Sequence, residues 1–164
     1  MARMSMRAFF LCIAVLMVAA PTANAAVADR FVPVYDKSDG VNVYTANDNR
    51  PRFLSEIGMK LASVVEDNSK GSKEFFIPWS AEKANELNSD IFVTWVPDAA
   101  TTGSIKADPL LGQIPAIKKG ALVADSDQTL TLSISASSPL SLPWSLDTFL
   151  PQLAAAADKV TAAK

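Results

Sequence analysis

The hydrophobic pattern alternates between short apolar runs and longer stretches with one apolar face. The strongest strand signal is at residues 89–96, where the apolar run is continuous rather than alternating. A run of that kind is typical of a strand buried on both faces of a parallel sheet. Shorter extended segments are predicted at 30–36, 75–79 and 121–125. The first of these contains Pro33 and reads as a short or edge strand.

Helices are predicted between these extended segments. One begins near Pro51, with Asp48 or Asn49 as its cap. Its apolar side chains recur at one-face spacing: Phe53, Leu54, Ile57 and Leu61. Others are predicted at 81–87 after Ser80, at 98–107 with Asp98 as cap, and from about Ser141 to the C-terminus, with Pro143 in the first turn and Pro151 bending the helix. Residues 37–51, 66–74 and 108–120 are predicted to be loops or turn-rich connectors.

Alternation of strands and helices predicts an α/β fold, with a small, largely parallel sheet of three or four strands flanked by helices. The predicted lobe comprises residues 26–164, and no internal repeat or low-complexity linker interrupts it. Its length is enough for one domain with a real core.

Residues 1–25 have the pattern of a cleavable secretory signal rather than of a structural element. Arg3 and Arg7 precede the apolar run 8–20, and Ala23 and Ala25 stand at small-residue cleavage positions. An uncleaved N-terminal anchor is the alternative. Cys12, the only cysteine, lies inside this segment and lacks the small residues before it that a lipoprotein site needs. The expected product is a periplasmic protein that is neither lipid-anchored nor disulfide-bonded.

Composition excludes several kinds of chemistry. The sequence has no histidine, and removal of residues 1–25 takes the formal net charge from −2 to −4. Imidazole catalysis, thiolate nucleophiles and zinc–thiolate sites are therefore excluded from residues 26–164. An acidic chain without a basic cluster is not expected to bind nucleic acid. Asp125 and Asp127 form a D-x-D pattern that is typical of a solvated turn. No enzyme, cofactor or metal site is predicted.

Aromatic and basic residues at loop–strand junctions are the candidates for ligand binding. In open α/β sheets, ligands lie beyond the carboxyl ends of the strands, which favours Trp95 at the end of the best strand. The other candidates are Tyr44, Arg50, Arg52 and Trp79. The plainer alternatives are a core position for Trp95 and for Trp79, of which Trp79 is expected to be partly exposed before a helix cap, and simple solvation for the two arginines.

Three segments together resemble one protein family. They are "SAEKANELNSDIFVTWVPD" (80–98), "ADPLLGQIPAIKKGALVADSD" (107–127) and "SPLSLPWSLDTFLPQLAAAA" (138–157). In order and spacing they are similar to the C-terminal half of bacterial ABC-transporter substrate-binding proteins for iron–siderophore complexes and cobalamin. Such proteins have two α/β lobes joined by a long helix, with the ligand between the lobes.

The resemblance implies a substrate-binding component of an importer that takes up ferric siderophores, with cobalamin as the alternative ligand. Arg50 and Arg52 would suit an anionic chelate, and the aromatic residues its rings. The resemblance also implies docking to an ABC permease through an acid on the helix of Glu82; the alternative is that Glu82 only serves its helix dipole. The N-terminal lobe is not evident in this sequence, so a complete site would require either dimerisation of this lobe or a separate chain that supplies the N-terminal lobe. A non-binding interaction module, or a remnant of a broken gene, is the rival.

Overall fold

The computed structural model describes residues 29–31 and 41–162 of the chain, so the predicted signal segment and Cys12 lie outside the described residues. The strands are β1 (Asp29–Phe31), β2 (Val41–Tyr44), β3 (Lys60–Leu61), β4 (Phe76–Trp79), β5 (Phe92–Trp95) and β6 (Leu122–Asp125). The α-helices are α1 (Asn49–Glu56), α2 (Ser63–Ser69), α3 (Ala99–Ala107), α4 (Pro115–Lys118), α5 (Gln128–Ser135) and α6 (Ser141–Ala162). Two 3₁₀ helices, η1 (Ala81–Glu86) and η2 (Leu111–Gln113), complete the fold.

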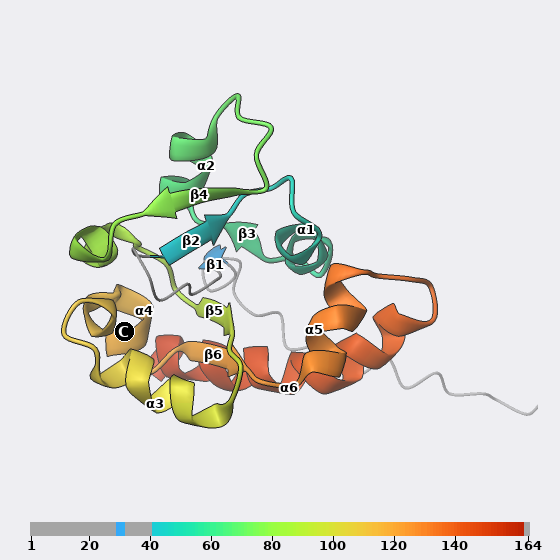
Figure 1. Ribbon diagram of the computed structural model, residues 1–164. Helices are drawn as coiled ribbons and strands as arrows, with labels where there is room; N and C mark the ends of the chain where they lie inside the picture. Colours follow the sequence, from blue (N-terminus) through green and yellow to red (C-terminus); the bar gives the residue numbers. More distant parts are fainter. Residues whose placement is uncertain (1–28, 32–40, 163–164) are drawn as a thin grey trace, which may run out of the picture.

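The strands associate in three pairs, which lie between helices (Figure 1). β5 pairs with β6 and β1 with β3, both parallel, whereas β2 and β4 are antiparallel. The prediction of an α/β fold with a small, largely parallel sheet is confirmed. The structure differs from the predicted single sheet of three or four strands, because the six strands of the described residues form three separate two-stranded ladders.

The centre of the core is β5, where the sequence pattern was strongest. Phe92 is 3% exposed, and Val93 and Thr94 are fully buried, so both faces of the strand are covered as predicted. α6 passes beneath β6 in Figure 1. Its buried positions recur every three or four residues: Ser145, Phe149, Leu153, Ala156 and Val160. This helix therefore closes the side of the core opposite α1 and β2.

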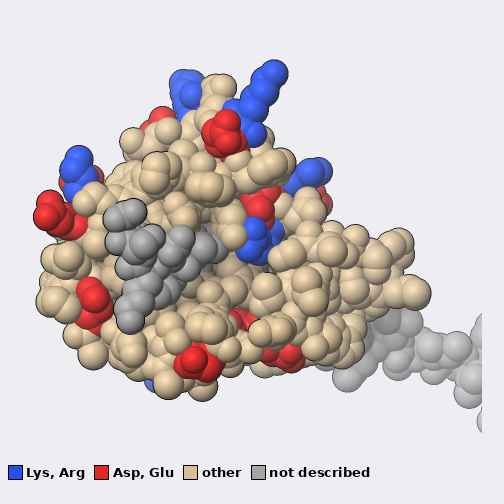
Figure 2. All heavy atoms as spheres, viewed as in Figure 1, with Lys and Arg blue, Asp and Glu red and all other residues tan. Residues whose placement is uncertain are grey.

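α5 was not foreseen, because residues 129–135 alternate between polar and apolar types as a strand would. In the structure Asp127 caps a helix that buries only Leu130 and Ile134, four residues apart, and leaves Leu132 65% exposed. A hydrogen bond between hydroxyl groups connects α5 to α6, with Ser133 Oγ and Ser145 Oγ 2.7 Å apart. Residues 128–146 carry no charge, and Figure 2 shows this end of the molecule without Lys, Arg, Asp or Glu.

Several other predicted elements differ from the structure. The helix expected to include Leu61 ends at Glu56, Leu61 lies on β3, and α2 extends into the predicted turn region 66–74. The predicted loop 37–51 contains β2, which pairs with β4 more than thirty residues later, a long-range partner that local pattern does not reveal. The predicted helix at 81–87 is the 3₁₀ helix η1, and the connector 108–120 contains η2 and α4. Among the described residues, no helix is both long and apolar enough to cross a bilayer.

Candidate functional site

Three of the five predicted ligand-binding residues meet at one edge of the fold. Tyr44 ends β2, Trp95 ends β5, and Arg50 lies in the first turn of α1. The Arg50 guanidinium carbon lies 3.5 Å from the centroid of the Tyr44 ring and 5.5 Å from that of Trp95. The two aromatic rings meet edge to face at 6.5 Å. This geometry is a cation–π arrangement built from three separate elements.

Arg50 is also paired with a carboxylate. Its Nε donates to Asp48 Oδ1 at 2.8 Å, and its Nη2 donates to Oδ2 at 2.9 Å. Asp48 is the N-cap of α1, and its Oδ1 also accepts the backbone N–H of Arg50 at 2.9 Å. The side chains are only 17% and 14% exposed, so this is a bidentate, partly buried ion pair. The positive charge of Arg50 is therefore neutralised locally.

Tyr44 presents a protonated phenol at neutral pH. Burial raises the pKa of Tyr44 above its ordinary value, although the neighbouring Arg50 opposes the rise. A protonated phenol can donate a hydrogen bond to an uncharged oxygen as well as accept one.

Trp95 contributes an unused donor. Its side chain is half-buried, and its Nε1 is buried without a hydrogen-bond partner among the described residues. Buried indole N–H groups usually have a partner, because an unpaired buried donor costs free energy. Trp95 is therefore neither a plain core residue nor fully exposed.

Asp125 lies beside Trp95, since the two are register partners on β5 and β6. Asp125 is 5% exposed, accepts the backbone N–H of Asp127 at 3.1 Å, and receives a long contact from the Thr131 hydroxyl at 3.4 Å. Burial raises the pKa of Asp125. The expectation of a solvated D-x-D turn is thus wrong for Asp125, while exposed Asp127 caps α5. The described residues contain no group of three or more potential metal ligands.

Trp79 and Arg52 lie apart from this cluster. Trp79 pairs with Val41 at the opposite end of the β2–β4 ladder from Tyr44, about 10 Å along the strand. Its indole N–H donates to the Lys83 carbonyl at 2.9 Å. Arg52 is exposed and sits about 200° around α1 from Arg50. The structure therefore brings together three of the five residues and separates these two.

Glu82 is exposed on η1 and lines a surface pocket of about 280 Å³. The pocket lies between η1 and the η2–α4 segment, and Leu110 and Lys118 line its other side. Glu82 is accessible to a partner, which the docking prediction requires.

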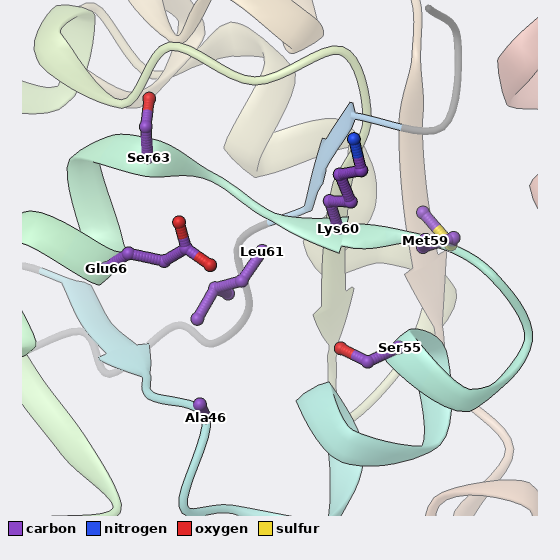
Figure 3. Close-up of a pocket in the computed structure, with 7 residues that line it drawn as sticks. All are labelled: Ala46, Ser55, Met59, Lys60, Leu61, Ser63 and Glu66. Atoms are coloured by element: carbon purple, nitrogen blue, oxygen red, sulfur yellow. The ribbon is translucent and has the colours of Figure 1, made fainter. Parts of the chain in front are cut away.

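A second pocket, of about 350 Å³, lies between α1, β3 and α2 (Figure 3). Its lining has no aromatic side chain: Ala46, Ser55, Met59, Lys60, Leu61, Ser63 and Glu66. In Figure 3 the side chains of Lys60 and Glu66 come from β3 and α2. Without aromatic surface this pocket does not have the lining of a typical organic ligand site.

Solved structures of transporter components share this fold. PiaA of Streptococcus pneumoniae TIGR4 in complex with ferrichrome matches with a TM-score of 0.70 and 30% identity, over 80% of this chain and 43% of that one. A second PiaA structure, described as an iron uptake ABC transporter substrate-binding protein, gives 0.66 and 30% over 80% and 44%. The siderophore periplasmic binding protein of Thermobifida fusca gives 0.58 and 17% over 77% and 44%, which shows the fold alone. No family model and no curated protein matches the sequence.

The chain therefore has the fold of one lobe of an ABC-transporter substrate-binding protein. The matched structures include proteins described with a siderophore or haem as ligand. This finding confirms the resemblance of the sequence to one lobe of such substrate-binding proteins. The chain spans less than half the length of the first three matched proteins. They are substrate-binding components rather than enzymes, in agreement with the prediction that this chain is not an enzyme.

Proposed function

We propose that this lobe forms one wall of a binding site for an iron–siderophore complex during ABC import. The observation that carries the proposal is the cluster of Tyr44, Arg50 and Trp95 at the ends of β2 and β5 and the start of α1. Ligands of open α/β folds lie at the carboxyl ends of strands. This edge carries aromatic surface and a buried indole N–H that has no partner among the described residues. The 30% identity to a protein solved with ferrichrome supports the same class of ligand.

A single wall gives an incomplete site. Binding sites normally enclose about 70–90% of a small ligand, whereas one wall covers roughly half of it. We propose that a second lobe supplies the opposite wall and that this lobe alone binds weakly.

The direct test is equilibrium dialysis of the purified full chain against ferrichrome loaded with radioactive iron, with haem and cobalamin in parallel. Saturable binding of ferrichrome is expected. Trp95→Phe should weaken it roughly tenfold, because an aromatic ring remains but it is smaller and lacks the Nε1–H donor. Trp79→Phe is the matched control and should leave the affinity unchanged, since Trp79 lies at the other end of the β2–β4 ladder. Absence of saturable binding for all three compounds would overturn the proposal.

We further propose that Glu82 contacts the permease. In support, its side chain is exposed beside a pocket. It also lies on the segment that corresponds to the helix carrying the docking acid in the family that the sequence resembles. Glu82→Gln should weaken binding to the solubilised permease–ATPase complex without changing ferrichrome affinity. Glu86→Gln, an equally exposed acid on η1, is the control. Equal effects of the two substitutions would point to general charge attraction and would contradict a role specific to Glu82.

A further inference from the structure

We infer that this wall selects an uncharged ferric chelate, such as a tris-hydroxamate, over an anionic one, such as a tris-catecholate. The inference rests on the proposed function and names the ligand class within it. Three hydroxamates, each a monoanion, neutralise a ferric ion. Three catecholates, each a dianion, leave the complex with three negative charges.

Arg50, the cation of the cluster, is held on two sides. Arg50 directs Nε and Nη2 at Asp48, and its planar group is stacked on Tyr44. Two of the five guanidinium N–H groups are thus directed at the carboxylate, and the charge of Arg50 is already paired. Any anion that approached Arg50 would also approach the Asp48 carboxylate. The pair therefore presents an aromatic, dipolar surface with no net charge.

Carboxylates follow the strands β5 and β6. Asp98 follows β5 as the cap of α3, and Asp125 and Asp127 follow β6. No Lys or Arg occurs between residues 84 and 105 or between 121 and 158. Among the described residues that directly follow β5 and β6, the charged side chains are therefore acidic. A trianionic chelate would be repelled here, whereas an uncharged chelate would not.

Two neutral hydrogen-bond donors also belong to this cluster. The indole Nε1–H of Trp95 has no partner among the described residues, and the Tyr44 phenol is protonated. Both are neutral donors, which suit the oxygens of an uncharged chelate. Arg52 does not alter this balance, because it is exposed about 200° around α1 from Arg50. The sequence-based expectation of an anionic chelate is thus reversed.

The test compares two probes, ferrichrome as the uncharged tris-hydroxamate and ferri-bacillibactin as the tris-catecholate. Radioactive-iron dialysis of the full chain at low ionic strength should show ferrichrome binding at least about tenfold more tightly. Asp48→Asn should narrow this ratio by roughly tenfold, because Asn retains a capping oxygen but leaves the charge of Arg50 unpaired. Asp67→Asn makes the same change of charge at an exposed position on α2 and should leave the ratio unchanged.

The outcomes separate the two proposals. If neither chelate binds, the proposed function itself fails. If ferri-bacillibactin binds as tightly as ferrichrome or more tightly, the binding function stands and the charge inference is overturned. A shift in Asp67→Asn equal to that in Asp48→Asn would also overturn it, because net charge rather than the Arg50–Asp48 pair would then set the preference.

Discussion

The guanidinium of Arg50 lies against the face of Tyr44, with 3.5 Å between its central carbon and the ring centroid. The contact connects the first turn of α1 to the end of β2, so it stabilises the fold as well as shaping the site. Partly desolvated cation–π contacts contribute about 1–2 kcal/mol.

Tyr44→Leu should therefore lower the free energy of unfolding by about 1–2 kcal/mol, since it removes the aromatic face. Tyr44→Phe keeps that face and should lie within about 0.5 kcal/mol of the wild type. Urea unfolding followed by circular dichroism measures both. If Phe were as destabilising as Leu, the hydroxyl rather than the ring would be the stabilising group.

Two neighbouring residues test whether α6 closes the core. Phe149 is fully buried, whereas Leu150 is 45% exposed. Phe149→Ala should destabilise the chain by about 3–5 kcal/mol through lost burial and the cavity that it leaves. Leu150→Ala should cost less than about 1 kcal/mol, because most of its side chain is already in water. Similar losses in urea unfolding would contradict the assigned face of α6.

Removal of the N-cap of α5 should destabilise the chain less than the Phe149→Ala substitution does. Asp127 Oδ1 accepts the backbone N–H groups of Thr129 and Leu130 at 2.8 and 3.4 Å. Asp127→Ala should cost about 1 kcal/mol, and Asp127→Asn only a few tenths, because Asn is as good an N-cap. Thermal or urea unfolding of the two variants resolves this difference. Equal stability of the Ala variant and the wild type would mean that α5 is held by its packing on α1 and α6 alone.

The elements with strong local signals were predicted from sequence. β5 and β6 were placed within a few residues, and the caps Asp48 and Asp98 were identified. α5 was missed because its period-two pattern is that of a strand, and contacts with α6 outweigh this local preference. β2 was missed because its partner β4 is distant in sequence.

The site was predicted in part for a similar reason. Junction positions identified Tyr44, Arg50 and Trp95, which the structure brings together. Trp79 is separated because β2 and β4 run antiparallel, and strand direction and order are not encoded in any short pattern. Asp48 was considered only as a cap, although it also forms the ion pair that cancels the charge of Arg50.

Asp125 gives the protein a pH dependence whose sign can be worked out. Burial raises the pKa of Asp125, an effect that the Asp127 N–H opposes, so the folded state binds this proton more readily than the unfolded state. The contribution to stability is full at pH values below the ordinary aspartate pKa. It is lost as the pH rises from that value through the raised one. At neutral pH the buried carboxylate of Asp125 therefore lowers the free energy of unfolding.

Asp125→Asn mimics the protonated form and should make the chain more stable than the wild type at pH 7. The difference should shrink as the pH approaches about 4. The contribution of Asp98 to stability has the opposite pH dependence, because hydrogen bonds from Thr101 lower the pKa of Asp98. Asp98 is present in both proteins, so its contribution cancels in the comparison. Urea unfolding of both proteins at the two pH values measures the difference. A wild type that is more stable than the variant at pH 7 would show that the hydrogen bonds from Asp127 and Thr131 outweigh the burial of the carboxylate.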